Sequence, residues 1–140
     1  MWQGEDTVDE FTTEECWTRL GENEVGRLAV AAAGQIDIFP INYYADGKTL
    51  LFRTAEGTKL LELTISGHVA FEIDGYSDTE AWSIVVKGAA HAVESQNEIL
   101  AADSLPLRPW IPTLKYTYVR ITPTEISSRH FLRSPEPERY

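Results

Sequence analysis

The sequence has little cysteine and few basic residues. Its one cysteine, Cys16, has no second cysteine with which to form a disulfide within the chain. Lysine and arginine together number 12, against 22 aspartate and glutamate residues, which gives a formal charge of −10. Nucleic-acid-binding surfaces gain affinity from clustered Lys and Arg. The acidic balance therefore argues against nucleic acid as a partner, and it makes any local cluster of basic residues more informative.

Long apolar runs and metal-ligand patterns are also missing from the sequence. No stretch approaches the roughly 20 apolar residues that a membrane-spanning helix needs. Residues 1–6 lack the basic and apolar segments of a secretory signal. We therefore expect a cytoplasmic protein with no membrane partner. The histidines, His68, His91 and His130, share no metal-ligand spacing, so no metal site is expected.

The spacing of turns and β-branched residues predicts a mainly β protein with short helices. Strands are expected over residues 25–33, 35–44, 49–53, 69–74, 81–93, 116–121 and 126–131. Helices are expected over 12–20, 54–63 and 99–102, with capping boxes that begin at Thr12 and Ser95. Asp46-Gly47 predicts a hairpin turn, Pro40 a strand edge or bulge, and Gly88 a bulge. Closely spaced strands joined by tight turns are typical of an antiparallel barrel.

Composition divides the chain into three parts. Residues 1–11 are acidic and unpatterned, and they are expected to form a flexible arm. Residues 12–133 are expected to form a single domain, which is long enough to bury a core without disulfides or metal. Within it, several prolines predict an extended connection around Trp110. Residues 134–140, rich in proline and charge, are expected to form a flexible tail.

The clearest chemical signal lies where a predicted strand leads through a short turn into a helix. Arg53 can bind two phosphate oxygens at once, and Lys59 adds a mobile positive charge. Thr54 and Thr58 supply hydroxyl groups, and Gly57 lets the backbone come close to a ligand. The glycine and lysine spacing is not that of a P-loop. The segment therefore predicts a site for a phosphate-sized anion, with an ordinary charged strand–helix junction as the alternative.

The same segment, Arg-Thr-Ala-Glu-Gly-Thr-Lys at 53–59 after Leu-Leu-Phe, closely resembles the phosphate-binding segment of the pyridoxamine 5′-phosphate oxidase-like family. Further stretches resemble that family in the same order: 25–29, 39–43, 70–74 and 82–88. The resemblance extends over residues 12–132. It implies a six- to seven-stranded antiparallel split β-barrel of the flavin mononucleotide (FMN)-binding type. It also implies a homodimer with FMN bound at the subunit interface.

By this resemblance, the flavin contacts a strand that lines its ring, the phosphate segment and a facing strand. The expected cofactor-binding residues are Ile41, Asn42, Phe52, Arg53, Thr54, Gly57, Thr58, Lys59, Trp82, Ser83 and Lys87. For Lys87, a solvent-facing position is the alternative. The C-terminal strand of family members often reaches the partner's flavin, so Trp110, His130 and Arg133 are further candidates.

The function implied by the resemblance is that of a flavin-dependent oxidoreductase acting on a small molecule that the sequence does not identify. The chain lacks the C-terminal segment with which true pyridoxamine phosphate oxidases bind their substrate, so oxidation of vitamin B6 is not expected. A deazaflavin-dependent reductase on the same fold is one alternative, although the long anionic tail of that coenzyme calls for more basic residues. A non-catalytic flavin-binding or storage protein is another. No residue stands out as a catalytic acid or base.

Overall fold

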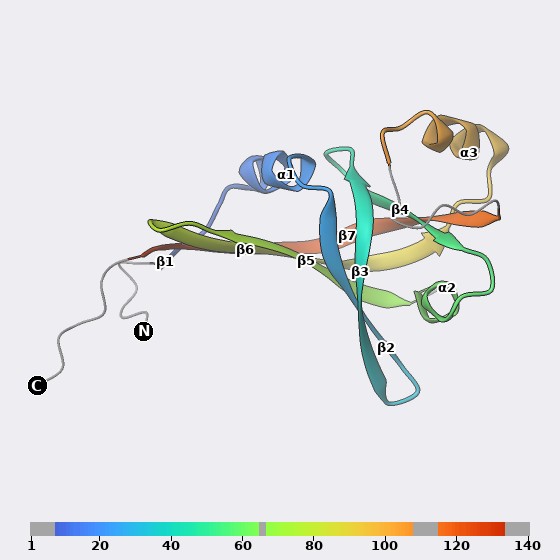
Figure 1. Ribbon diagram of the computed structural model, residues 1–140, viewed down its shortest axis with the longest axis horizontal. Coiled ribbons are helices and arrows are strands. Elements are labelled where there is room, and N and C mark those ends of the chain that lie inside the picture. Colours follow the sequence, from blue (N-terminus) through green and yellow to red (C-terminus); the bar gives the residue numbers. More distant parts are fainter. Residues whose placement is uncertain (1–7, 65–66, 108–114, 134–140) are drawn as a thin grey trace, which may run out of the picture.

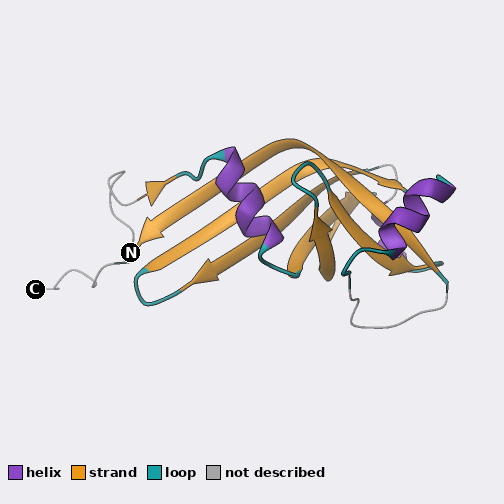
Figure 2. Ribbon diagram, turned by 90° about the horizontal axis from the view of Figure 1, so that it is seen from above, coloured by secondary structure: helices purple, strands orange, loops and turns teal. Residues whose placement is uncertain are grey.

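A ring of antiparallel strands dominates the computed structural model, which describes residues 8–64, 67–107 and 115–133 (Figures 1 and 2). The strands are hydrogen-bonded in the order β1-β7-β4-β3-β2-β5-β6, and β6 also pairs with β7, which closes the ring. The strands are β1 (Val8–Asp9), β2 (Val25–Ala32), β3 (Gln35–Ala45), β4 (Leu50–Ala55), β5 (His68–Tyr76), β6 (Glu80–Ala92) and β7 (Tyr116–Leu132). The helices are α1 (Thr13–Gly21), α2 (Lys59–Thr64) and α3 (Gln96–Asp103). The predicted mainly β fold with short helices is confirmed.

The ring is split between β3 and β4. These strands pair only over residues 43–45 and 50–52, whereas residues 35–42 of β3 pair with β2. The β2–β3 hairpin therefore projects from the rest of the barrel (Figure 1). Pro40 lies in this projecting part, where no second described strand pairs with β3. A residue without an N–H group is tolerated at such an edge, so the predicted edge position is confirmed.

Local turn chemistry explains the hairpins and the bulge. The β2–β3 turn places Ala33 at φ 51° and Gly34 at φ 80°. Gly47, at φ 90°, follows Asp46, whose Oδ1 accepts hydrogen bonds from the backbone N–H groups of Lys48 and Thr49. At Gly88 the β6–β7 register shifts, and a Cβ atom there would lie 2.3 Å from the carbonyl oxygen of Thr122. The predicted turn and bulge are both confirmed.

The core lies on one face of the sheet, which we call the inner face. Alternate residues of β2, β5 and β6 fill it: Leu28, Val30, Phe71, Ile73, Ile84 and Val86, all at most 2% exposed. Helix α1 covers part of this face and contributes Cys16 and Leu20 to the core (Figure 2). The helix begins at Thr12, whose hydroxyl accepts a hydrogen bond from the backbone N–H of Glu15, as the capping box predicted. The opposite, outer face contains residues such as Ile38 and Ala70.

Two predicted element boundaries are wrong. The helix expected over 54–63 begins only at Lys59, because β4 continues to Ala55, where it is held by pairing with β7. The strands expected over 116–121 and 126–131 form one strand, β7. Pro123 does not end that strand because it lies opposite Gly88, at the bulge. Both errors arise because long-range pairing overrides local signals.

The ordered structure also extends into the expected N-terminal arm. Val8 pairs with Phe131 and Asp9 with His130, so residues 8–9 add a strand to the end of β7. Residues 1–7, the tail at 134–140 and the connection at 108–114, which includes Trp110, lie outside the described residues. None of the described helices is long and apolar enough to cross a membrane.

Candidate functional site

The end of β4 brings two of the predicted hydroxyl groups together. Thr54, only 7% exposed, places its Oγ1 3.2 Å from Oγ1 of Thr58. The Thr58 hydroxyl also donates to the carbonyl oxygen of Ala55 and accepts from the backbone N–H of Leu61. Gly57, at φ 75°, makes the turn between them. The side chains of Thr54 and Thr58 are thus held in place before any ligand arrives.

Lys59 reaches from the start of α2 towards the projecting hairpin. Its Nζ lies 3.7 Å from Oδ1 of Asp37 on β3, and its side chain is 63% exposed. An exposed ion pair of this kind contributes little to stability. The charge of Lys59 is therefore available to an anion that enters between α2 and β3. Asp37 was missed by sequence reasoning because nothing local marks it as a partner of Lys59.

Arg53 lies on the other side of β4 from Thr54. Its guanidinium carbon is 4.2 Å from the centre of the Tyr116 ring, and the residue is paired across the strands with Tyr118. Its Nε is buried and has no hydrogen-bond partner among the described residues. A buried donor without an acceptor is costly, which makes this atom a candidate contact for an anionic ligand. The structure therefore places the two predicted cations, Arg53 and Lys59, on different sides of the end of β4.

A pair of tyrosines and a carboxylate surround Arg53. The hydroxyls of Tyr116 and Tyr118 donate to Oδ1 of Asp103, at 2.8 and 2.7 Å. These two bonds, that of Tyr118 first, hold the pKa of Asp103 below its ordinary value. Burial, together with the bond to Asp103, raises the pKa of Tyr118. Asp103 thereby ties α3 to β7. Its role was not foreseen because its tyrosine partners lie beyond the segment that carried the chemical signal.

The residues of β3 and β4 that were predicted to line the flavin ring lie partly in the hydrophobic core. Ile41 is 6% and Phe52 is 1% exposed, and both belong to the main hydrophobic cluster. Asn42 is half-buried and pairs with Val25 on β2. Since the side chains of Ile41 and Phe52 pack inward, a ligand in the split can meet these two residues mainly through their backbone.

The predicted residues of β6 lie elsewhere, and they point to different faces. Trp82 faces inward, 6.2 Å from Phe11, with the Arg19 guanidinium 4.9 Å from its ring. Ser83 faces outward, because its neighbour Ile84 is in the core. A pocket of 470 Å³ beside them is lined by Trp82, Ser83, Asp74, Tyr76 and Arg133, among others. The structure thus brings Arg133 close to Ser83.

Two further predicted candidates belong to ion pairs. His130 on β7 lies 2.8 Å from a carboxylate oxygen of Glu80, and its ring centre is 5.0 Å from that of Phe11. Lys87 is exposed on the outer face, and its Nζ is 3.8 Å from Glu125 on the neighbouring strand. No group of three His, Cys, Asp or Glu side chains in the described ranges is placed to hold a metal ion.

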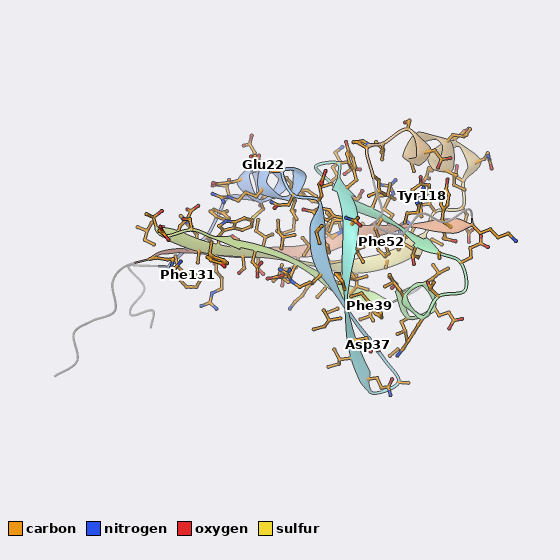
Figure 3. The ribbon with its side chains drawn as sticks, in the orientation of Figure 1. Glu22, Asp37, Phe39, Phe52, Tyr118 and Phe131 are labelled. Carbon is orange, nitrogen blue, oxygen red and sulfur yellow. The ribbon has the colours of Figure 1, made fainter. Side chains whose placement is uncertain are left out.

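The β4 end and the β6 pocket are far apart within one chain. Thr54 is paired with Thr117 near the start of β7, and Trp82 is paired with His130 near its end. At about 3.3 Å per residue, this separation is up to roughly 40 Å along the strand. In Figure 3, Phe131 beside the β6 pocket lies near one end of the molecule, well separated from Phe52 and Tyr118. The two groups cannot contact the same flavin ring within one chain.

The outer face carries exposed apolar side chains. Ile36 is 76% and Ile38 is 66% exposed, both on the projecting hairpin. An open pocket of 390 Å³ on this face is lined by Ala29, Ala31, Ile36, Ala70 and Lys87, among others. Contiguous apolar surface that a single chain leaves exposed is typical of an association site.

Charged side chains lie beside this apolar surface. Arg27 on β2 donates hydrogen bonds to Glu72 and Asp74 on β5, at 2.8 and 2.7 Å. Burial raises the pKa of Glu72, and the Arg27 bond opposes that rise. The outer face therefore presents charges of both signs.

The chain matches a family of known proteins over most of its length. The family model described as pyridoxamine 5′-phosphate oxidase matches residues 12–130. A Corynebacterium glutamicum protein named for pyridoxamine 5′-phosphate oxidase is 42% identical, with 96% of this chain and 100% of that one covered and a TM-score of 0.86. The FAD binding protein from Mycobacterium smegmatis is 36% identical. The match covers 90% of this chain and 100% of that one, with a TM-score of 0.82. An uncharacterized Mycobacterium tuberculosis protein, Rv3129, is 44% identical over 93 residues, 66% of this chain and 84% of its own.

Proposed function

This chain belongs to the pyridoxamine 5′-phosphate oxidase family, as its segments predicted, and we propose that it binds a flavin nucleotide in the split between β3 and β4. The observation that carries this proposal is the arrangement at the end of β4. Beside the part of β3 that does not pair with β4, Lys59 offers a cation and Thr54 and Thr58 place two hydroxyls, and Arg53 adds a buried Nε–H that has no partner among the described residues. A phosphate group in the split can pair with Lys59 and accept from the Thr54 hydroxyl, whereas Arg53 lies on the other side of β4.

The nucleotide could be FMN, as the sequence resemblance implies, or FAD, as in the M. smegmatis relative. Both ligands share the flavin ring and the phosphate nearest to it. In either case, the bound flavin supplies the redox chemistry. The chain's own part is to orient the ring through the backbone of β3 and to hold the phosphate. We propose an oxidoreductase acting on a small molecule.

We propose further that two copies of the chain form the complete site. The β4 end and the pocket at Ser83 and Arg133 are too far apart to serve one ligand within a single chain. A second copy docked on the outer face would bring its Ser83 and Arg133 to the flavin of the first. The exposed Ile36 and Ile38 and the mixed charges of Arg27 and Glu72 suit a self-complementary contact.

The first experiment identifies the ligand of the purified protein. We expect a yellow protein whose released ligand has the mass of FMN or FAD, and whose flavin absorbance bleaches with a reduced nicotinamide cofactor. A flavin that resists every reductant would favour a binding or storage protein. A released deazaflavin would favour the alternative reductase. A protein that binds none of these ligands on titration would refute the proposal.

The role of Lys59 is tested by Lys59→Ala, with Lys48→Ala as the matched control. Both lysines are exposed, but Lys48 lies in the β3–β4 turn away from Thr58. Losing a charge-assisted phosphate contact of about 1.5–3 kcal/mol should weaken flavin binding at least tenfold. Thermal stability of the unliganded protein should change little, because the Asp37 pair is exposed. Equal flavin affinity in Lys59→Ala and Lys48→Ala would remove Lys59 from the site.

The shared site is tested by mixing two inactive variants. Lys59→Ala alters the phosphate side and Arg133→Ala the side that comes from the second copy. Each variant alone should bind flavin weakly, whereas mixed and re-equilibrated subunits should regain about a quarter of the parental sites, because one site of each heterodimer is intact. A mixture that regains no binding would place both residues in the same chain's site, and normal flavin binding by Arg133→Ala alone would leave Arg133 outside it.

A further inference from the structure

The part of the sheet that carries the β6 pocket extends beyond the rest of the barrel. Strand β5 pairs with β2 only over residues 69–72, so residues 73–76 of β5 pair only with β6 among the described strands. Figure 2 shows α1 lying across the strands on this side of the molecule. The place of the β5–β6 hairpin relative to the barrel therefore depends on what packs against its inner face.

Trp82 is the aromatic residue on the inner face of this hairpin. Its indole ring lies over Gly75, the residue paired with it on β5, because a Cβ atom on Gly75 would be 2.8 Å from the ring. Phe11 meets the same ring edge to face at 6.2 Å, and its backbone N–H donates to the Ser128 hydroxyl on β7 at 2.9 Å. Trp82 and Gly75 also line the β6 pocket, so a shift of their contact shifts the pocket.

Arg19 on α1 adds a charge to this aromatic contact. Its guanidinium carbon lies 4.2 Å from the centre of the Phe11 ring and 4.9 Å from that of Trp82. A guanidinium within about 6 Å of an aromatic ring is attracted to the electron-rich face of that ring. The ion pair of Arg19 with Glu15 is looser, at 3.6 Å, and partly exposed. Arg19 therefore ties α1 to the hairpin chiefly through the two rings.

The cation of the β6 pocket is fixed to the same hairpin. The backbone N–H of Arg133 donates to the carbonyl oxygen of Thr79 at 2.8 Å, and its Nη1 donates to that of Ser77 at 2.6 Å. Both acceptors lie in the turn between β5 and β6. The guanidinium of Arg133 therefore moves with the hairpin that Trp82 anchors, and so does Ser83, the next residue along β6.

We infer that Arg19 is a positioning residue of the flavin site. From the inner face it holds the β5–β6 hairpin, and through the hairpin it holds Ser83 and Arg133 where the flavin of the second copy meets them. The inference rests on the proposed flavin binding and on the proposed sharing of the site by two copies. Arg19 does not touch the flavin itself, because it packs on the inner face whereas Ser83 faces outward. Arg19 of one copy thus acts on the flavin of the other.

The test asks to which side of the shared site Arg19 belongs. Arg19→Met keeps the length of the side chain and removes its charge, and alone it should bind flavin about tenfold more weakly than the parent. At a flavin concentration between the two dissociation constants, re-equilibrated mixtures are compared. Arg19→Met with Lys59→Ala should regain about a quarter of the parental sites, because one site of each heterodimer is intact. Arg19→Met with Arg133→Ala should regain none, because both variants alter the same side.

A matched control separates positioning from general loss of stability. Arg120 has the same 23% side-chain exposure as Arg19 and also pairs with a carboxylate, but it holds Asp46 and Thr49 at the β3–β4 turn. Whatever stability Arg120→Met loses, it should bind flavin within about twofold of the parent. Arg19→Lys keeps a cation beside the two rings and should bind flavin within about threefold of the parent.

The outcomes separate this inference from the proposed function. Parental flavin affinity in Arg19→Met would remove Arg19 from the site. No regained sites with Lys59→Ala would show that Arg19→Met damages the whole chain, since each regained site takes its Lys59 from the Arg19→Met chain. A quarter of the sites regained with Arg133→Ala would place Arg19 on the phosphate side. Each of these results overturns the inference alone, provided that Lys59→Ala mixed with Arg133→Ala regains sites. A parent that binds no flavin would overturn the proposed function, and the inference with it.

Discussion

The two faces of the sheet differ in what covers their apolar side chains. On the inner face, Leu28, Phe71 and Ile84 are fully buried beneath α1 and the closed ring. On the outer face, Ile36 and Ile38 are 76% and 66% exposed. Both sets come from strands of the same sheet, and strand alternation alone sends them to opposite sides. The inner set stabilises the single chain, and the outer set is the surface that the proposed dimer would cover.

This contrast also bears on where the proposed flavin site lies. Among the described residues, the inner face is filled by the side chains of the main hydrophobic cluster. Thr54, Thr58 and Lys59 instead gather where the sheet splits, and Ser83 and Arg133 lie on the outer face. A site assembled from an open edge of one copy and an outer face of another needs both kinds of surface to stay uncovered in the single chain.

The largest effect on the unfolding free energy is expected from a substitution that leaves a cavity in the inner face. Phe71 is fully buried and packs edge to face on Tyr43 at 4.7 Å. Phe71→Ala should lower the free energy of unfolding by about 3–5 kcal/mol, from lost burial and the cavity left behind. Urea unfolding of the flavin-free protein measures this loss. A decrease below about 1 kcal/mol would mean that the inner face does not carry the stability assigned to it.

A smaller loss of unfolding free energy is expected from adding a methyl group at Gly26, where the inner face is closely packed. A Cβ atom on Gly26 would lie 2.2 Å from Cζ of Phe71, so Gly26→Ala forces the ring to move. The cost should be about 1–3 kcal/mol by urea unfolding. In a Phe71→Ala background the same substitution should cost much less, because the two residues are in contact. Additive losses would show that Gly26 is constrained by something other than the ring.

The sequence predicted the features that depend on neighbouring residues. Asp46 and Gly47 make their turn and Thr12 caps α1, because each needs only local backbone geometry. Gly88 marks the bulge because only a residue without a side chain leaves room for the carbonyl oxygen of Thr122. The antiparallel barrel followed from the close spacing of the strands and their tight turns. Family resemblance then added that the barrel is split.

The arrangement of the site depended on long-range pairing and was less predictable. Pairing with β7 extends β4 to Ala55, and this extension sends Arg53 and Thr54 to opposite sides instead of into one helix start. The distance between Ser83 and Lys59 depends on the length of β7, which was expected as two shorter strands. Neither the sides on which Arg53 and Thr54 lie nor the distance from Ser83 to Lys59 can be predicted from the local sequence.

On the outer face, removing apolar side chains should affect association and leave the fold intact. We expect the double variant Ile36→Ser and Ile38→Ser to change the unfolding free energy of the monomer by less than about 0.5 kcal/mol, since both side chains are already exposed. Its dimer dissociation constant, measured by sedimentation, should rise at least about tenfold. Serine at Leu100, another exposed apolar residue but on α3, is the control and should leave association unchanged. A double variant that associates like the parent would remove the hairpin from the interface.

The smallest expected effect is a pH dependence of the unfolding free energy, which arises from Glu72 on the outer face. Burial raises the pKa of Glu72 above its ordinary value, although Arg27 opposes the rise. The folded chain therefore keeps this proton to higher pH than the unfolded chain, so the contribution of Glu72 to stability falls as pH rises from the ordinary pKa through the raised one. In the monomeric Ile36→Ser and Ile38→Ser background, this fall should be well under about 1 kcal/mol, because the group is partly exposed. Adding Glu72→Gln should remove it, whereas Glu98→Gln should not. An unfolding free energy whose pH profile is the same with and without Glu72 would show that the Arg27 bond offsets the burial of this carboxylate completely.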